Sequence, residues 1–482
     1  MTDNYEQAAE QFMQEVGREH YENGAGLKDS LDIVPIYFRY LWLFDRPSVD
    51  KFLQRQDREG RHLAAFACAG YASAQVNAMT EEITNSVTRA VIEWRGEEVP
   101  YRRASVILAN EADAGKRHEL ENLIHAKTEE QNPLRAERLR MLHGVAGELG
   151  FAGYIEMCDD LQGINMPWLI EKTGELLRRT EKTYAHELGY FLDKIGVDQE
   201  DAAASDLSYL FRSPEFDNLF PQEQLVPSLT RTMAGLGIDL NSQKNVHLDT
   251  EPRPLKSPRA FCVPLRIPDE VYLVISPRGG QDDYRAILHE SGHAEHFAHI
   301  SPDLPFAFKR LGDGAISESY SFLFDNLMKN PLWLSDVLHI DDVDEYLRMS
   351  RFHKLWILRR YSAKLHYESE LHRADNIESM RSRYSNMLGS ALGVRISQSN
   401  YLADVDDGLY AANYLRAWIF EVMMREYLEK TCGERWYSTI EAGEFLKSLW
   451  RQGQSRPTDE ICRDFGFDGL DAEPLIAELA VG

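Results

Sequence analysis

Apolar residues recur every three or four positions through most of the chain, which is the spacing of one face of an α-helix. This pattern predicts a mainly α-helical fold. Pro133 and Pro167 support this prediction, because proline suits the first turn of a helix, where the backbone N–H needs no partner. The helical segments expected on this basis are 5–21, 31–44, 73–94 and the stretches opening at Pro133 and Pro167.

Residues 244–277 depart from the helical pattern. Five prolines punctuate short strand-like runs there, which predicts a small sheet. A turn with Gly279 and Gly280 follows, and then a helical segment that we expect to continue to about Ala298. The break favours two parts, an N-terminal helical half at 1–245 and a second half at 246–482.

Composition narrows the function classes. Among 482 residues, 78 acidic side chains outnumber 53 basic ones and give a net charge of −25. A nucleic-acid-binding protein needs a basic face, so we expect no nucleic-acid partner. The most apolar long stretch, 409–424, contains Arg416 and Glu421, so we expect a buried helix and no membrane partner. Five scattered cysteines and no visible leader segment favour a reducing, cytoplasmic location.

Residues 289–293 read His-Glu-Ser-Gly-His, an HExxH pentad. On a helix, His289 and His293 share one face, where two imidazoles can hold one Zn²⁺. Glu290 is placed to take a proton from a water at that metal, which is the role of a general base. The pentad therefore predicts a zinc site with hydrolytic chemistry.

A catalytic zinc needs a third protein ligand and one open position. Gly312 and Gly314 mark a break before a second helix that contains Glu318. A helix–connector–helix arrangement would bring Glu318 beside the two histidines and complete a His₂Glu ligand set. Asp325 lies seven residues further along the same face, where it could accept a hydrogen bond from a ligand histidine.

His299 offers a second route to a third ligand. The spacing from His293 to His299 is that of the metzincin pattern, in which a glycine turns the chain back toward the metal. Residues 293–300 contain no glycine or proline. The helix should therefore continue and carry His299 away from the metal.

These residues together resemble the thimet oligopeptidase and oligoendopeptidase F family of zinc peptidases, within the gluzincins. The segments 256–261 and 271–276 are similar to the two strands that precede the family's active helix. The family's HExGHxxH pattern matches His289, Glu290, Gly292, His293 and His296. Its second segment matches Glu318, Ser321, Asp325 and Asn326.

The resemblance implies a two-lobed helical metallopeptidase with a deep cleft and a small β-sheet next to the HExxH helix. It implies one Zn²⁺ per chain, and short unfolded peptides as substrates and partners. An extended peptide would pair with the edge strand at Ala260, Phe261 and Cys262. Whether the chain acts as a monomer or a homodimer is left open.

A C-terminal segment resembles the family's tyrosine helix, whose phenols donate to the developing oxyanion. Tyr410 and Tyr414 match two of its tyrosines. Ala417 stands at the third tyrosine, and Val405 stands where the family has a histidine. The resemblance implies Tyr414 and Tyr410 as oxyanion donors.

Two other functions stay open. One is a zinc carboxypeptidase of the same class, which needs a cation for the C-terminal carboxylate; Arg416 and Arg278 are candidates. The other is a non-catalytic helical protein that keeps the zinc site as structure. Glu290 argues against the second, because a structural site has no use for a general base.

Overall fold

The computed structural model describes residues 2–480, most of which are helical. This confirms the mainly α-helical fold with a small sheet. No helix in the described range combines the length and the apolarity needed to cross a membrane.

The chain forms two compact units, each built from separate stretches. The first unit comprises 1–71, 214–347 and 416–475, and the second comprises 72–213, 348–415 and 476–482. The expected boundary at residues 245 and 246 does not coincide with this division. The reason is long-range packing: the first helix packs against the sheet that precedes the pentad, which places it in the same unit.

The first unit holds the sheet and the helices around it. Its described elements are α1 (Thr2–Gly24), α2 (Val34–Arg39), the 3₁₀ helix η1 (Leu41–Phe44), α3 (Arg46–Leu53), α12 (Leu225–Gly235), β3 (Val246–Asp249), β4 (Phe261–Arg266), β5 (Glu270–Val274), α13 (Gln281–His299), α14 (Phe306–Arg310), α15 (Gly314–Asp325), α16 (Pro331–Leu338), α20 (Ile440–Trp450) and α21 (Thr458–Asp464).

The second unit is helical apart from one hairpin. Its elements are β1 (Val91–Trp94), β2 (Glu97–Pro100), α5 (Tyr101–Asn110), α6 (Ala114–Glu129), α7 (Asn132–Glu148), α8 (Tyr154–Gln162), α9 (Met166–Arg179), α10 (Glu181–Lys194), α11 (Ala204–Arg212) and α18 (Met380–Leu392). Four longer helices contribute residues to both units: α4 (Arg58–Arg89), α17 (Asp344–Leu371), α19 (Tyr410–Cys432) and α22 (Glu473–Ala480).

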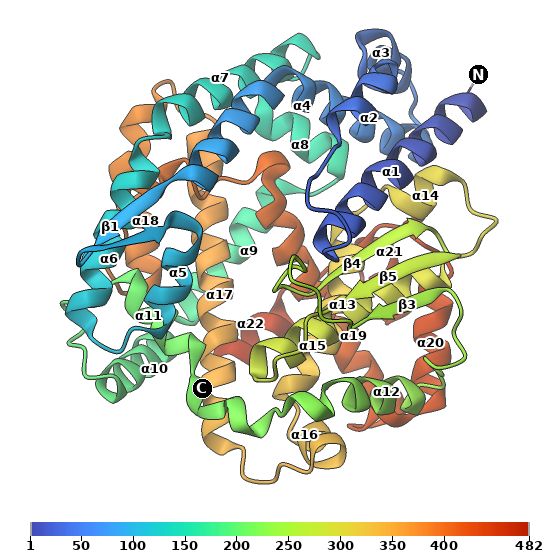
Figure 1. The fold of residues 1–482 in the computed structure, drawn as a ribbon. Helices are drawn as coiled ribbons and strands as arrows, with labels where there is room; N and C mark the ends of the chain where they lie inside the picture. Colours follow the sequence, from blue (N-terminus) through green and yellow to red (C-terminus); the bar gives the residue numbers. More distant parts are fainter. Residues whose placement is uncertain (1, 481–482) are drawn as a thin grey trace. The chain divides into compact units, whose positions relative to one another are not determined.

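The sheet of the first unit has the strand order β3-β5-β4. The central strand β5 is parallel to β3 and antiparallel to β4. Pro264 lies in β4, which suits an edge strand because proline cannot donate a ladder hydrogen bond. Helix α13 packs against β4 and β5, so the pentad helix lies directly against the sheet (Figure 1).

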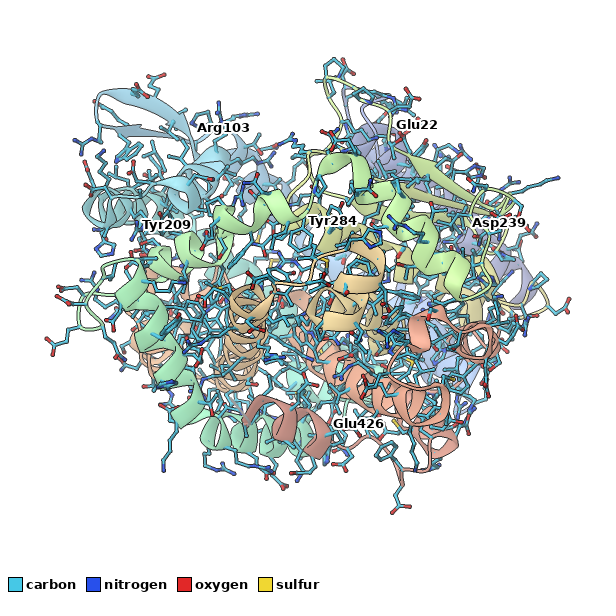
Figure 2. The ribbon with its side chains drawn as sticks, turned by 90° about the horizontal axis from the view of Figure 1, so that it is seen from below. Glu22, Arg103, Tyr209, Asp239, Tyr284 and Glu426 are labelled. Carbon is cyan, nitrogen blue, oxygen red and sulfur yellow. The ribbon has the colours of Figure 1, made fainter. Side chains whose placement is uncertain are left out.

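The first turn of α13 is fixed in the protein interior. The side chain of Tyr284, which is labelled in Figure 2, is fully buried. Its hydroxyl donates to the carbonyl oxygen of Pro221 at 2.7 Å, and its ring packs on Phe220. This anchoring holds the start of the pentad helix.

The structure corrects two expected elements. Residues 91–94, expected as the end of a helix, form β1, because Arg95 and Gly96 adopt positive φ and turn the chain into a hairpin with β2. The first expected strand, 256–261, is irregular until Phe261. Lys256 is buried there, and its Nζ donates to the Asp249 carboxylate at 2.9 Å instead of lying along a strand.

Two expected helices are divided. The segment 31–44 forms α2 and η1, and the helix expected after Pro167 forms α9 and α10, which meet at Thr180. The pentad helix and the Glu318 helix are present as expected, as α13 and α15.

Candidate metal centre

Helices α13 and α15 bring three potential ligands together. Oε2 of Glu318 lies 3.6 Å from Nε2 of His289 and 3.7 Å from Nε2 of His293. The two histidines lie four residues apart, so both imidazoles face the same side of α13. Each of the three residues offers one potential ligand atom, and these atoms all lie within 4.8 Å of one another. The described residues 2–480 contain no other such group of three or more His, Cys, Asp or Glu side chains.

The spacing of these atoms fits one zinc ion. Zinc–ligand distances of about 2.0–2.2 Å place tetrahedral neighbours about 3.3–3.6 Å apart. The observed separations from Glu318 to each histidine are close to that range. Two imidazoles and one carboxylate are also the protein donor set of a catalytic zinc with one open position. The residues present therefore fit the ion.

The outer nitrogens of both histidines have hydrogen-bond partners. Nδ1 of His289 lies 3.2 Å from Oδ2 of Asp325, and Nδ1 of His293 lies 2.8 Å from Oγ of Ser317. An ionised carboxylate only accepts, so Nδ1 of His289 donates and its Nε2 keeps a lone pair for a metal. The expected Asp325 contact is confirmed. Ser317 was missed, because a serine one residue before a ligand carries no spacing signal.

The surroundings favour the neutral form of His293 and the ionised form of Asp325, as metal binding needs, but they favour the protonated form of His289, whose proton a metal would have to displace. Burial lowers the pKa of His293 well below its usual value, and the nearby histidines add to this effect. Burial alone would lower the pKa of His289, but Asp325, Glu318 and Glu290 outweigh it and raise the pKa. Burial would raise the pKa of Asp325, but Lys329 and His289 hold it below its usual value.

Glu290 lies beside the cluster in a partly buried position. Burial raises its pKa to about 7, and the charge of Glu318 adds to this. The charge of His289 and the backbone of Cys262 act in the opposite direction and lower the pKa. A carboxyl group with a pKa near neutrality can both accept and return a proton, which is the property of a general acid–base residue.

Gly292 explains how α13 and α15 approach closely enough to share a metal. A Cβ added to Gly292 would lie 2.5 Å from Cα of Ser321 and 2.7 Å from the Tyr320 carbonyl oxygen. Both neighbours are backbone atoms, so no side-chain rotation relieves the contact. The glycine of the pentad is therefore required by packing.

Replacing Gly292 with Ala is expected to lower the free energy of unfolding by about 1–3 kcal/mol, because the added methyl group separates the two helices. Chemical denaturation measures the change. Gly189→Ala in α10 is the matched control: apart from its own stretch of helix, no atom lies within 4 Å of its added Cβ. It should stabilise the protein by about 0.5–1 kcal/mol through helix propensity. Equal effects of the two substitutions would contradict the close-approach explanation.

Replacing Asp325 with Ala is expected to weaken zinc binding about 10- to 100-fold, because His289 loses the acceptor that orients its ring. Competition with a chromogenic chelator measures the affinity. Asp341→Ala removes an exposed acid that bonds to Ser335 and should leave the affinity unchanged. A zinc affinity that is the same in both variants would rule out the orienting role.

A buried ion pair supports the helix that carries Glu318. The carboxylate of Asp313 caps α15 by accepting from the Ala315 N–H at 3.0 Å. It also accepts two bonds from the Arg416 guanidinium at 2.7 and 2.8 Å, and two more from Thr458. Because its guanidinium is already paired with Asp313, Arg416 does not serve as the carboxylate-binding cation of a carboxypeptidase.

The other candidate ligands on α13 do not join the three-residue cluster. The helix continues through His299, whose Nδ1 donates to the Glu295 carbonyl oxygen at 2.9 Å. His296 is fully buried against Tyr320. Neither belongs to the three-residue cluster, so the expectation that His299 points away is confirmed.

The remaining predicted residues are distributed over both units. Ala260 precedes the edge strand β4, and Phe261 and Cys262 begin it. Tyr410 and Tyr414 form an edge-to-face pair in the first turn of α19 and belong to the second unit, whereas the cluster belongs to the first. Their role as oxyanion donors stays a prediction.

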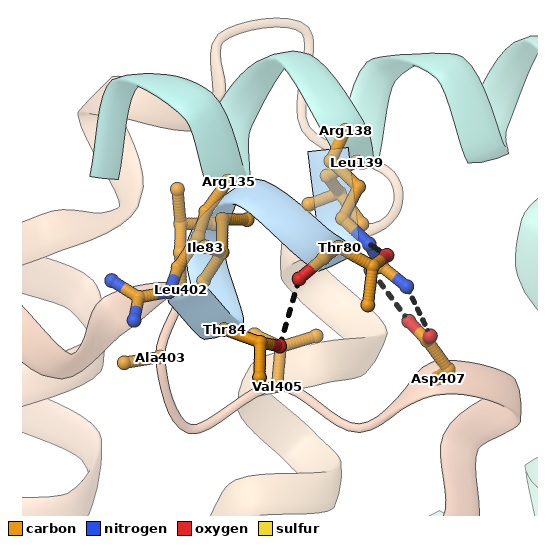
Figure 3. Close-up of a pocket in the computed structure, with 10 residues that line it drawn as sticks. All are labelled: Thr80, Ile83, Thr84, Arg135, Arg138, Leu139, Leu402, Ala403, Val405 and Asp407. Atoms are coloured by element: carbon orange, nitrogen blue, oxygen red, sulfur yellow. Dashed lines mark hydrogen bonds and ion pairs between the residues drawn. The ribbon is translucent and has the colours of Figure 1, made fainter. Parts of the chain in front are cut away.

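The second unit contains an open pocket of about 170 Å³ (Figure 3). Arg138 points into it, but the guanidinium already binds both carboxylate oxygens of Asp407 and the hydroxyl of Thr80. An anionic ligand would have to displace Asp407. The His₂Glu cluster is therefore the better candidate for the functional site than this pocket.

Comparisons with known proteins identify no relative: no protein-family model matches the chain, and no curated protein matches it.

Proposed function

We propose that this protein is a zinc metallopeptidase that hydrolyses short peptides. One observation carries the proposal: Nε2 of His289, Nε2 of His293 and Oε2 of Glu318 converge within 4.8 Å, and Glu290 lies next in sequence to His289. A structural zinc site would fill all four positions with protein ligands, whereas three ligands and an adjacent carboxyl group suit catalysis.

Zinc, when bound by these three residues, would lower the pKa of a coordinated water to about 7 and polarise the substrate carbonyl. Glu290 accepts the proton of the attacking water and orients the oxygen toward the carbonyl carbon. It then returns the proton to the leaving amine nitrogen, so that the C–N bond breaks with a neutral amine. Asp325 and Ser317 hold the ligand histidines in the required orientation.

The resemblance to oligoendopeptidases supports internal cleavage of short, unfolded peptides. The edge position of β4 is consistent with this, because an extended peptide can pair with an edge strand. The same proposal includes a cleft between two lobes, Tyr414 and Tyr410 as oxyanion donors, and a cytoplasmic location.

The proposal predicts metal-dependent cleavage of peptides. Incubation of the zinc-loaded protein with a defined peptide mixture, followed by mass spectrometry, should reveal internal cuts. A chelator should abolish them, and added Zn²⁺ should restore them, since the attacking water loses its activation without the metal. Cleavage that persists in excess chelator would reject the zinc mechanism.

C-terminal amidation distinguishes the two peptidase types. An endopeptidase should cut an amidated peptide and its free acid at similar rates, because it does not bind the terminal carboxylate. A carboxypeptidase should cut only the free acid. Single-residue release from the free acid alone would favour the carboxypeptidase.

A further inference from the structure

Large apolar side chains lie exposed along the segment that follows α1. Phe38 is 69% exposed, which is unusual for a phenylalanine in a folded unit. We call the exposed set the apolar ridge, and it consists of Leu27, Leu31, Val34, Phe38, Leu41 and Trp42. Scattered single apolar side chains are normal on a folded surface, whereas several large ones within one short segment call for an explanation by an interaction.

The ridge is the outer face of a segment whose inner face is fixed on α1. The Tyr37 ring packs edge-to-face on Phe12, and Leu43 is fully buried. Lys28 pairs with Glu19 of α1, and Arg39 pairs with Glu15. The segment is therefore held in place, and its apolar side chains do not turn inward.

The ridge begins beside the strand that borders the candidate metal centre. The Gly24 carbonyl oxygen accepts from the Ser257 N–H at 2.7 Å, and the Ala25 carbonyl oxygen accepts from Arg253 at 2.9 Å. A Cβ on Gly24 would lie 2.6 Å from the Phe261 ring. The end of α1 thus lies against the start of β4 (Figure 1).

Strand β4 links this contact to the general base. Phe261 touches the end of α1, and the backbone of the next residue, Cys262, lies close enough to Glu290 to lower the pKa of that carboxyl group. Leu255, which is 60% exposed, extends the apolar surface on the β4 side. A peptide that pairs with the β4 edge and extends past Phe261 would meet Leu255 and Leu27.

We propose that the apolar ridge binds the apolar side chains of the peptide substrate on one side of the bond that is cut. This inference rests on the proposed peptidase function and specifies its substrate class as extended peptides with large apolar side chains. Main-chain pairing with a strand edge is indifferent to sequence, so a neighbouring apolar surface supplies the selectivity.

Charge favours a peptide over a membrane as the occupant. Amphipathic segments that bind anionic lipid carry unpaired Lys and Arg beside their apolar face. Here Lys28 and Arg39 are paired with glutamates of α1, and the chain carries a net charge of −25. The ridge therefore lacks the basic flank that an anionic bilayer requires.

The test compares two peptides of equal length, one rich in Leu and Phe and one with Ser and Gln at the same positions. For the double variant Leu27→Ser/Leu31→Ser, the KM of the apolar peptide should rise about tenfold, because two apolar contacts are lost. Its kcat, the zinc content and the KM of the polar peptide should stay unchanged. Ile440→Ser, which alters an equally exposed residue of the first unit, should change nothing.

Binding is measured separately from cleavage, with fluorescently labelled peptides and zinc-loaded Glu290→Gln protein. If the ridge variants weaken apolar binding but no peptide is cut by the wild type, the ridge assignment stands and hydrolysis fails. If peptides are cut and the ridge variants match the wild type, the ridge assignment fails alone. A wild-type dimer that dissociates in the double variant, or vesicle binding that the variant abolishes, would also overturn it.

Discussion

Replacing Glu290 with Gln is expected to leave zinc bound and to lower the rate of peptide hydrolysis by about 10²–10⁴-fold, the usual contribution of a general acid–base residue. Gln has nearly the same shape, so the ligands His289, His293 and Glu318 keep their positions. It cannot take a proton from water, and it cannot return one to the leaving amine. Metal analysis and peptide turnover on the same preparation measure both parts of the result.

Glu295→Gln is the matched control for this substitution. Glu295 lies on the same helix, and burial raises its pKa to about 7 as well. Its carboxylate accepts from Gln243 at 3.0 Å and lies 3.3 Å from Nδ1 of His299, so it is engaged away from the cluster. Hydrolysis by this variant should stay close to the wild-type rate. Near wild-type turnover by Glu290→Gln would eliminate the proposed mechanism.

Replacing Arg416 with Ala is expected to lower the free energy of unfolding by about 3–5 kcal/mol, because it leaves the buried carboxylate of Asp313 without its cation. Arg416 is 1% exposed, so water does not replace the lost bonds. Since Asp313 also caps α15, the position of Glu318 should become less defined and zinc affinity should fall. Denaturation with urea and metal competition measure the two effects.

Arg435, an exposed arginine, is the control for how much burial adds to the energetic cost of losing the cation. Arg435 makes a comparable two-point contact with Asp336, but both side chains are solvent-accessible. Arg435→Ala should cost only about 0–1 kcal/mol, because water solvates the remaining carboxylate. If Arg416→Ala were as mild as Arg435→Ala, the Asp313 pair would not be what holds α15.

Much of the candidate site could be predicted because its parts follow local helical periodicity. The four-residue spacing of His289 and His293 places both on one face of any helix that contains them. The same argument covers Asp325, two turns beyond Glu318, and His299, which a continuous helix carries away from the metal. The structure confirms the geometry of each, whereas zinc binding and hydrolysis stay proposals.

The fold was predicted less completely where local geometry depends on particular turns. Helical periodicity indicated the mainly α-helical class and the two helices of the site. It did not reveal the hairpin of β1 and β2, because positive φ at Arg95 and Gly96 leaves no periodic pattern. The strand expected at 256–261 begins only at Phe261, because Lys256 is drawn into a buried bond with Asp249.

By itself, the sequence determined which side chains can act as metal ligands and as general base, since these depend on residue type and on spacing within one helix. Only the tertiary structure decided what holds them. Three contacts each join separate elements: the bond between Nδ1 of His293 and Oγ of Ser317, the ion pair between Arg416 and Asp313, and the close approach of Gly292 to Ser321. Contacts between separate elements carry no period along the chain, so they become visible only when the elements pack.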